Sequence, residues 1–289
     1  SLMNYSGLHQ GTYYPIGGFH EIIVALSKLA KEKGVAINYN SVVNKIAVSN
    51  NEADHLIVNG KKLEFDGVVA AADYHHVEQV LLDKKYRNYN NEYWEKREMA
   101  PSSLLFYVGV DKKLENIHHH NLFFDEDFDQ HAKEIYDEPN WPKNPLFYLS
   151  CPSITDTTVA PKGEENLMFL IPLAPGLQDN NEMREKYFKI VLERLKKLTG
   201  NDIKNNIVYK KSYCVNDFKE DYNAFKGNAY GLANTLRQTA IFKPSMRNNS
   251  IKNLYYTGQL TVPGPGVPPS IISGQIVAQE IDKQLKKAS

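Results

Sequence analysis

The sequence predicts a mixed α/β protein of the α+β type, in which helices cover a mixed or antiparallel sheet. Three observations predict it. Residues 19–34 carry apolar side chains at helical spacing and end at a glycine. Asn59-Gly60 stands between two short apolar runs, which is typical of a β-hairpin. After residue 102, strand-like runs alternate with one amphipathic helix, as in a sheet with helices packed on it.

Length, composition and charge narrow the class of protein. The chain has 289 residues, of which 42% are hydrophobic and 24% charged, so it can bury a sizeable core and exceeds the usual size of one domain. We therefore expect two domains. Lys plus Arg and Asp plus Glu each number 34, and this balance gives no basic field for nucleic acid. No run of 18 apolar residues occurs, which excludes a transmembrane helix from this sequence.

The first third of the chain predicts one helix, a hairpin and a short strand. The helix at 19–34 ends at Gly34, a natural C-cap. Its apolar face comprises Ile22, Ile23, Leu26, Leu29 and Ala30. Residues 35–49 alternate like a strand and lead into the hairpin. Residues 66–73 then predict a short buried strand, followed by a helix at 74–83.

The middle of the chain predicts a sheet covered by one helix. Strand-like runs occupy residues 102–111, 144–153, 166–174 and 205–215. The helix covers 180–200. Its apolar face comprises Met183, Tyr187, Ile190, Val191, Leu195 and Leu198.

The C-terminal segment predicts a strand, a rigid loop and a helix. Residues 254–256 read as a buried strand that ends at Gly258. Glycines 264 and 266 allow close backbone approaches, and Pro263, Pro265, Pro268 and Pro269 stiffen the path between them. The following helix carries an apolar stripe that predicts firm packing: Val267, Ile271, Gly274, Ala278, Ile281 and Leu285. Its N-terminus suits an electron-rich ligand group, although a tight connection without a ligand is equally consistent with the pattern.

This segment, residues 253–281, resembles the C-terminal signature of the phytoene desaturase family, FAD-dependent enzymes that act on carotenoids. In that signature a strand ending in Gly leads through Pro-Gly-x-Gly-Val-Pro into a helix. Further family blocks are matched in order by residues 11–46, 68–82, 146–173 and 227–258. The resemblance therefore covers most of the chain.

The resemblance implies a fold, a cofactor and a reaction. It implies a partial FAD-binding domain of the glutathione-reductase-like type at 1–92, a substrate domain at 93–240, and a return to the FAD domain at 241–289. The cofactor would be FAD and the substrate a long apolar polyene, with a hydride passing from an allylic carbon to the flavin. Carotenoid isomerases, retinoid saturases and non-catalytic prenyl carriers share this scaffold and remain alternatives.

The resemblance also implies site residues. It places the loop of Gly264, Pro265, Gly266, Val267 and Pro268 beneath the isoalloxazine ring, where the backbone N–H groups of its last residues would stabilise negative charge on the reduced ring. It places Gly258 and Gln259 near the ribityl chain and pyrophosphate. Val43 would lie against the adenine, with ordinary core packing an equal alternative.

Two features of the site stay open at this stage. Many related flavoenzymes carry Asp or Glu at the position of Gln259, so a role for charge there is in doubt, although an amide still forms hydrogen bonds. No catalytic residue or proton acceptor is recognisable by spacing.

The sequence contains no G-x-G-x-x-G motif, with which flavoproteins of this type hold the pyrophosphate. We therefore expect a piece of a longer protein, with Ser1 a tag remnant, that by itself binds FAD weakly or not at all and is inactive. Because carotenes dissolve only in lipid, the complete protein should be cytoplasmic and attach peripherally to a membrane surface. The sequence does not identify the docking element.

Other polar groups receive structural interpretations. The consecutive residues His118, His119 and His120 should point in different directions, so we expect no metal site. His75 and His76 follow a strand and favour a hinge or interface role, with general-base work as the alternative. The two cysteines, Cys151 and Cys214, lie in apolar strand-like contexts and predict inert buried thiols rather than a disulfide.

Overall fold

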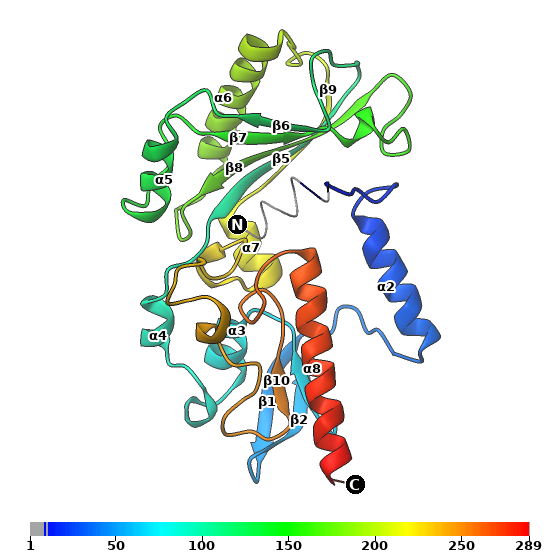
Figure 1. The fold of residues 1–289 in the computed structure, drawn as a ribbon, viewed down its shortest axis with the longest axis vertical. Coiled ribbons are helices and arrows are strands. Elements are labelled where there is room, and N and C mark those ends of the chain that lie inside the picture. Colours follow the sequence, from blue (N-terminus) through cyan, green and yellow to red (C-terminus); the bar gives the residue numbers. More distant parts are fainter. Residues whose placement is uncertain (1–8, 10, 289) are drawn as a thin grey trace.

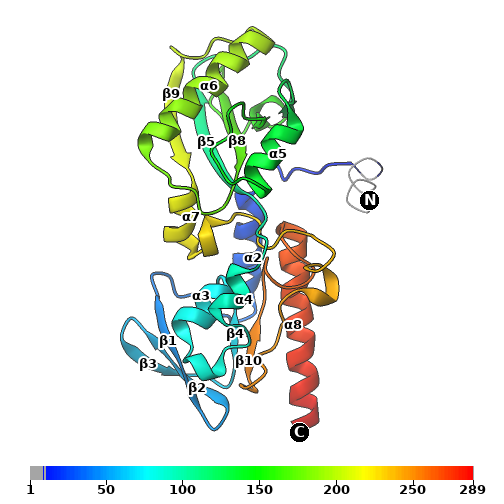
Figure 2. The same cartoon turned by 90° about the vertical axis from the view of Figure 1, so that its left-hand side faces the viewer.

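The computed structural model describes residue 9 and residues 11–288; the expected tag remnant at Ser1 lies outside the described residues. Figure 1 shows two parts stacked along the long axis, an upper part built on one sheet and a lower part that carries the C-terminal helix. The chain enters the upper part after α4 and returns through α7 (Figure 2).

The lower part begins with one helix and a three-stranded antiparallel sheet. The helix is α2 (His20–Glu32), and the sheet has the order β1-β2-β3, with bounds Val43–Ser49, Glu52–Val58 and Lys61–Glu64. Asn59 and Gly60 both have positive φ, at 47° and 77°, as a two-residue hairpin turn requires. The predicted helix and hairpin are therefore confirmed, while residues 35–42, expected to be extended, precede the strand.

A second sheet of two parallel strands brings distant segments together. Strand β4 (Val68–Ala70) pairs with β10 (Leu254–Tyr256), with Val68 opposite Leu254. Strand β10 is buried as predicted, but Val69 of β4 is 46% exposed, so the prediction that β4 is buried was wrong. The remaining elements of the lower part are α3 (Tyr74–His76), which continues into a π-helical turn at Val77–Leu81, a 3₁₀ turn at Lys84–Tyr86, α4 (Asn91–Glu95) and α8 (Val267–Ala288).

The upper part is an antiparallel five-stranded sheet with the order β6-β7-β8-β5-β9. Its strands are β5 (Ser102–Val110), β6 (His120–Phe123), β7 (Phe147–Ser150), β8 (Glu165–Leu173) and β9 (Ile207–Tyr213). Its helices are α5 (Phe128–Tyr136), α6 (Asn181–Thr199) and α7 (Val215–Tyr222). The predicted substrate-domain strands are present, and β6, α5 and α7 were not foreseen.

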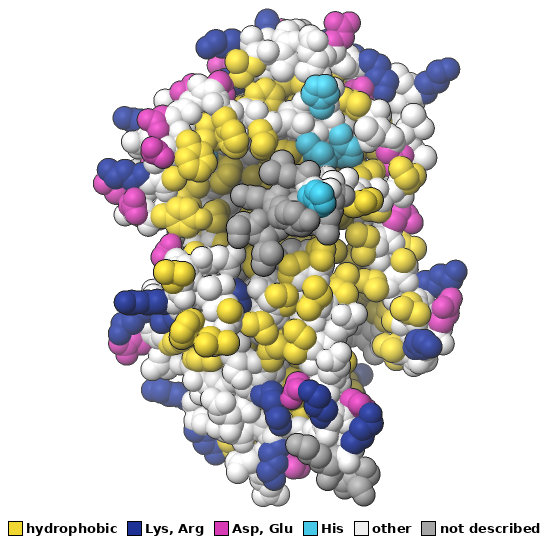
Figure 3. All heavy atoms as spheres, in the orientation of Figure 1, with side chains coloured by type: hydrophobic (Ala, Val, Ile, Leu, Met, Phe, Trp, Pro, Cys, Tyr) yellow, Lys and Arg dark blue, Asp and Glu magenta, His cyan; other side chains and the backbone are white. Residues whose placement is uncertain are grey.

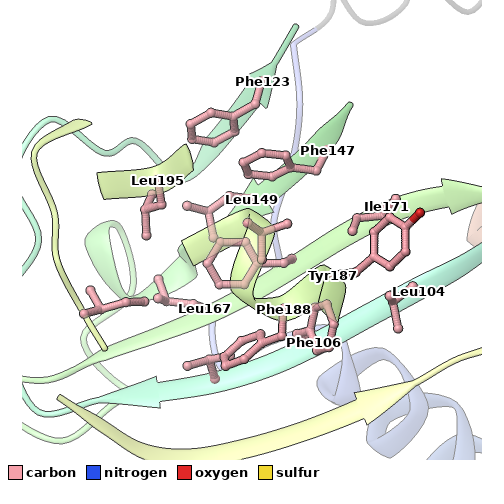
Figure 4. Packing of buried hydrophobic residues seen from close by; sticks show 14 of the residues in the cluster. Leu104, Phe106, Phe123, Phe147, Leu149, Leu167, Ile171, Tyr187, Phe188 and Leu195 are labelled. Carbon is pink, nitrogen blue, oxygen red and sulfur yellow. The ribbon is translucent and has the colours of Figure 1, made fainter. Parts of the chain in front are cut away.

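One face of this sheet forms the upper core. Alternate residues of β5 and β8, such as Phe106 and Phe169, are fully buried beneath α6 (Figure 4). From the predicted apolar face of α6, Tyr187, Val191 and Leu195 are buried, whereas Leu198 is 44% exposed.

The opposite face of the sheet carries a row of side chains that crosses all five strands. The register places Leu122 opposite Tyr148, Tyr148 opposite Leu170, Leu170 opposite Leu105, and Leu105 opposite Tyr213. Directly opposed residues of antiparallel strands share one face, so these five form a continuous row, called here the apolar row. None of the five is fully buried.

The lower part has its own core. This core includes residues from both chain crossings, which are the segments beside α4 and after α7 where the chain passes between the two parts; the second is called the return crossing. Tyr74 stacks on Tyr256 at 4.0 Å between ring centroids, and Trp94 is completely buried beside them. Phe225 and Leu232 pack in the same core. The domain boundaries at 92/93 and 240/241 remain predictions, and this packing assigns residues on both sides of them to one core.

The C-terminal helix packs through a different face from the predicted one. The fully or nearly buried residues of α8 are Ser273 and Val277, whereas Val267, Ile271 and Leu285 of the predicted stripe are exposed. The prediction of firm packing through that stripe was therefore wrong for the described part of the chain. Figure 3 shows hydrophobic side chains gathered across the middle of this face of the molecule.

The return crossing depends on Gly227. This residue has φ +63°, and a Cβ there would lie 2.5 Å from the carbonyl oxygen of Val215. Gly227→Ala should lower the free energy of unfolding by about 3 kcal/mol, since overpacking adds to left-handed strain. Gly60→Ala has a similar positive φ but open space, and should cost about 1 kcal/mol. Urea denaturation of both variants measures this, and equal losses would contradict the close contact.

Candidate functional site

The candidate site lies where the two parallel strands β4 and β10 end. Their carboxyl ends lead into loops at the same edge of the sheet, which is where ligands bind in open α/β sheets. A cavity of about 530 Å³ opens there, within the roughly 300–1,000 Å³ of small-molecule sites. It is lined by Ala71, Ala72, Asp73, Tyr74, Phe218, Tyr222, Ala224, Asn228, Ala229, Thr257, Gly258, Gln259, Leu260, Ser270 and Gly274. We call it the junction cavity.

A buried serine fixes the loop after β10 to α8. Ser273 Oγ accepts a hydrogen bond from the backbone N–H of Gly258 at 3.0 Å. The same oxygen is hydrogen-bonded to the hydroxyls of Thr257 and Thr261, at 2.8 and 2.9 Å. The strand end and the helix are therefore held together by three hydrogen bonds to one atom.

The first turn of α8 leaves only a few backbone donors for a ligand. Pro268 and Pro269 have no N–H group, and the N–H of Ser270 donates to the carbonyl of Gly266 at 3.0 Å. The backbone N–H groups of Gly266 and Val267 are therefore the ones that this turn can offer, at the positive end of the helix dipole. Gly264 and Gly266 have φ of +136° and +112°, a conformation that favours glycine.

Two of the predicted site residues lie at the junction cavity, and the roles of all of them stay predictions. Gly258 and Gln259 line the junction cavity directly. The loop residues 264–268 form the approach to α8, whose Ser270 and Gly274 also line the cavity.

Val43 lies elsewhere. It lines a second cavity of about 590 Å³ beside β4. Both cavities are bordered by Ala71 and Ala72, so they flank the same strand end. This arrangement agrees with an extended ligand that passes the end of β4, and the role of Val43 stays a prediction.

Sequence reasoning missed Asn228. Its amide Nδ2 donates to the carbonyl of Phe225 at 2.7 Å, and its Oδ1 accepts from the N–H of Gly231 at 2.7 Å. The side chain of Gln259 lies 3.5 Å from the same Oδ1. Asn228 thus holds the return crossing against the loop after β10. No spacing signal identifies it, because its partners are backbone groups nearby and a loop distant in sequence.

Asp73, which also lines the cavity, was missed as well. Its carboxylate accepts from the N–H of His76 at 3.1 Å, as the N-cap of α3, and from the N–H of Phe225 at 3.3 Å. Burial raises the pKa of this carboxyl to about 6, although its backbone hydrogen bonds oppose the shift. Asp73 therefore joins the start of α3 to the segment that follows α7.

The other polar groups have structural partners. His119 hydrogen-bonds Thr155 at 2.7 Å and His120 hydrogen-bonds Tyr148 at 2.6 Å. The two imidazole rings stack at 4.3 Å, contrary to the expectation that they point apart. Among the described residues, no group of three His, Cys, Asp or Glu side chains could hold a metal ion.

The two cysteines agree with their sequence interpretation. Cys151 and Cys214 are free and completely buried, and burial raises the pKa of each thiol to about 12, so both are inert as predicted. His75 lies against the Phe225 ring at 4.1 Å between centroids, beside the core of the lower part, and its hinge or interface role stays a prediction. Within residues 11–288, none of the helices has the length and apolar character needed to cross a bilayer.

Residues 1–282 match the family described as flavin containing amine oxidoreductase. The chain belongs to this family. Its similarity to carotenoid desaturases is also confirmed. It is 42% identical to a carotenoid 3,4-desaturase of Haloarcula japonica over 97% of the chain, and 29% identical to a zeta-carotene-forming phytoene desaturase of Myxococcus xanthus over 97%. The chain spans only 57% and 54% of these two relatives.

Solved structures confirm the fold class. An oxidoreductase from Methanosarcina mazei superposes with a TM-score of 0.61 at 17% identity, covering 92% of this chain and 55% of that one. A putative protoporphyrinogen oxidase from Exiguobacterium gives 0.57 at 11% identity, covering 92% of this chain and 51% of that one. At these identities the likeness shows the fold alone.

Membership of this flavin-dependent family indicates a flavin cofactor, and the residues present fit one. A Cβ on Gly258 would meet only the carbonyl oxygen of Ala71, at 3.8 Å, so the backbone there is open to a close ligand. The cavity adds the side-chain amide of Gln259 and the aromatic rings of Tyr74, Phe218 and Tyr222, and the loop at Gly266 and Val267 leads into the α8 helix that borders it. This combination suits a planar group with polar edges.

Asp73 generates a pH-dependent prediction. Because its pKa is raised from 3.8 to about 6 in the folded state, the stability it contributes is present below pH 3.8 and is lost as the pH rises through about 6. The Asp73→Asn variant keeps one acceptor oxygen but does not titrate. Between pH 3.8 and a pH above about 6, the free energy of unfolding of the wild type should therefore fall by about 3 kcal/mol relative to that of the variant. Urea denaturation at a series of pH values measures the difference. A difference that stays constant with pH would contradict the raised pKa.

Proposed function

We propose that the complete protein is an FAD-dependent carotenoid desaturase. In this proposal the described residues supply the binding site for the cofactor's redox ring and one wall of the substrate site. The main support for this proposal is the position of the junction cavity. Two of the side chains that line it pack against the last residue of the apolar row of the upper sheet.

Aromatic side chains connect the two features. Phe218 and Tyr222 of α7 line the junction cavity. Tyr213, the last member of the apolar row, packs its ring against Phe218 at 4.9 Å and Tyr222 at 6.5 Å between centroids. At the other end of the row, Leu122, Tyr148 and Leu170 line a third cavity of about 300 Å³ beneath α5. An apolar surface therefore runs from the cavity across the sheet.

The dimensions of this surface suit a long, thin substrate. Five strands span four inter-strand spacings of about 4.8 Å, so the row is about 19 Å long. A polyene has only apolar atoms along most of its length. The row presents Leu side chains and Tyr rings to it, because the hydroxyls of Tyr148 and Tyr213 are already hydrogen-bonded to His120 and Asp221. The curated relatives that support this substrate class are named as desaturases of carotenoids.

When bound, FAD supplies the acceptor for a hydride, which no side chain can provide. The residues of this chain bind, orient and exclude water. The backbone N–H groups of Gly266 and Val267, with the α8 dipole, favour negative charge at the ring edge. Gln259, whose side chain Asn228 contacts, offers amide hydrogen bonds, and the apolar row keeps water away from the reacting carbon.

We also propose that residues beyond those described complete the cofactor site with a dinucleotide-binding strand, turn and helix. The chain spans 57% of the Haloarcula relative, and three of its apolar surfaces have no protein cover among the described residues. These surfaces are α2 with Leu26 and Leu29, β4 with Val69, and α8 with Ile271, all more than 40% exposed. An added segment that buries them would also bring the pyrophosphate cradle to the end of β4.

The isomerase, saturase and carrier alternatives have less support. The curated relatives are named as desaturases, an oxygenase and a dehydrogenase. Peripheral membrane attachment belongs to the same proposal, because the substrate dissolves in lipid. Leu122, Phe124 and Phe128, each more than 60% exposed around the cavity beneath α5, are the apolar side chains that would enter the bilayer surface.

Anaerobic addition of phytoene or a later carotene, in neutral liposomes, to the FAD-loaded complete protein tests the function. The visible flavin band should bleach, and the protein should float with the liposomes. Gly266→Val should lose bound flavin and bleaching, since it puts a branched side chain at φ +112° beside Pro269. Gly60→Val, at φ +77° in an exposed hairpin, should keep both.

Three outcomes would contradict this account. A bound flavin that stays oxidised with every carotene would exclude desaturation. A Gly266→Val protein with normal flavin content and turnover would remove the loop from the site. A complete protein that bleaches yet never floats with liposomes would exclude the membrane attachment.

A further inference from the structure

A buried lysine lies next to the loop that leads to α8. Lys243 follows a 3₁₀ turn at Ala240–Phe242, and the residue is only 6% exposed. Its Nζ is completely buried and has no hydrogen-bond partner among the described residues. Lysines are almost never buried without a partner, because removing an ammonium group from water costs several kcal/mol. The position therefore needs an explanation that its protein contacts do not supply.

The side-chain nitrogen of Lys243 lies against the backbone of the loop at residues 264–268, which the family resemblance places beneath the flavin ring. A Cβ placed on Gly264 would lie 3.5 Å from Lys243 Cε and 3.6 Å from Nζ. The tip of Lys243 therefore lies against the glycine, two residues before the backbone donor of Gly266. The loop and the lysine come from the same return segment, so the structure brings them together without help from the upper part.

The charges at this place are alike. The N-terminus of α8 carries the positive end of the helix dipole, and a protonated Lys243, against Gly264 in the loop before the helix, would add a second positive charge to this region. Burial lowers the pKa of Lys243, as expected for an ammonium group without a counter-ion. Two unpaired positive groups destabilise one another unless a negative group lies between them. A negatively charged ligand would satisfy both at once.

We propose that Lys243 is the counter-charge for the negative edge that forms on the cofactor's ring when the ring accepts a hydride. This inference rests on the proposed function and adds to it a residue that the loop alone did not reveal. The helix N-terminus and the backbone donors of Gly266 and Val267 would hold the ring edge, and the ammonium of Lys243 would stabilise its charge from behind Gly264.

Two parts of the cofactor carry negative charge, and they predict different behaviour. The pyrophosphate is charged before and after reduction, so a lysine bound to it would strengthen both states equally. The ring edge becomes charged only on reduction, so a lysine beside it would strengthen the reduced state selectively. The selectivity between the two redox states therefore identifies the partner.

Sulfite titration of the FAD-loaded complete protein measures this selectivity without turnover. Sulfite adds to N5 of an oxidised flavin, a sulfur–nitrogen bond forms, and the electron pair of the ring moves to the N1–C2 edge as negative charge. Lys243→Met should weaken sulfite binding by about tenfold or more, since a donor to a developing charge is removed. The affinity of the Lys243→Met protein for oxidised FAD should be the same as that of the wild type. The matched control, Lys283→Met on the exposed side of α8, should change neither.

The melting temperature of the Lys243→Met variant serves as the control for an effect on folding. Replacing an unpaired buried ammonium with an apolar side chain of similar length should leave the melting temperature unchanged or raise it. A lower melting temperature would mean that Lys243 has a structural partner, and would overturn the proposal.

The remaining outcomes are distinct. Equal weakening of oxidised FAD and of the sulfite adduct would assign Lys243 to the pyrophosphate, and unchanged sulfite affinity would remove it from the site; either result overturns the inference while leaving the proposed function intact. A complete protein that binds no flavin would instead overturn the proposed function, and the inference would fall with it.

Discussion

The parallel pairing of β4 with β10 is the constraint on which the rest of the structure depends. These strands have three residues each and lie far apart in the sequence, at Val68–Ala70 and Leu254–Tyr256, with all strands of the upper sheet between them. Their pairing places the loop at Ala71–Asp73 beside the loop at Gly258–Leu260. Without it, the junction cavity would have one wall, and α8 would have no fixed position relative to the chain crossings.

So short a pair of strands needs support from side chains. Asn253 bonds to both backbone groups of Ala53, at 2.7 and 3.1 Å, and to the carbonyl of Asp66 at 2.9 Å, which ties the three-stranded sheet to the start of β10. Glu78 is completely buried and accepts hydrogen bonds from the N–H groups of Asn88 and Tyr89, at 2.7 and 3.0 Å. Burial raises its pKa to about 7. These buried polar contacts define one arrangement of the lower part, since each unmade bond would leave a desolvated group.

Local patterns predicted the elements that local chemistry determines. The Asn59-Gly60 turn and the C-cap at Gly34 both adopt positive φ, and the Pro-Gly loop leads into a helix as expected. The buried face of α8 could not be predicted, because several of its faces are apolar and only the neighbouring elements select one. Strand β6, with four residues and His120 at its start, has no alternating pattern and is defined by pairing with β7.

The residues of the candidate site also fall into two groups, those that the sequence indicated and those that only the structure revealed. The rigid, close-approaching loop at 264–268 was predicted from its glycines and prolines, which act through the backbone, whereas the roles of Gly258 and Gln259 were implied only by the family resemblance and stay predictions. Asp73, Asn228 and Lys243 were not predicted, because their importance arises from burial and from partners distant in sequence. The resemblance to carotenoid desaturases supplied the chemistry, whereas the structure supplied the connection between the cavity and the apolar row.

The central claim is that the junction cavity receives the redox ring of the cofactor. The most direct measurement is a crystal structure of the complete protein with bound FAD. The account predicts that the ring fills this cavity beside Gln259, with its N1–C2 edge against the backbone N–H groups of Gly266 and Val267 and one face toward Tyr213 and the apolar row. A ring bound elsewhere, or one that turns that edge away from α8, would contradict it.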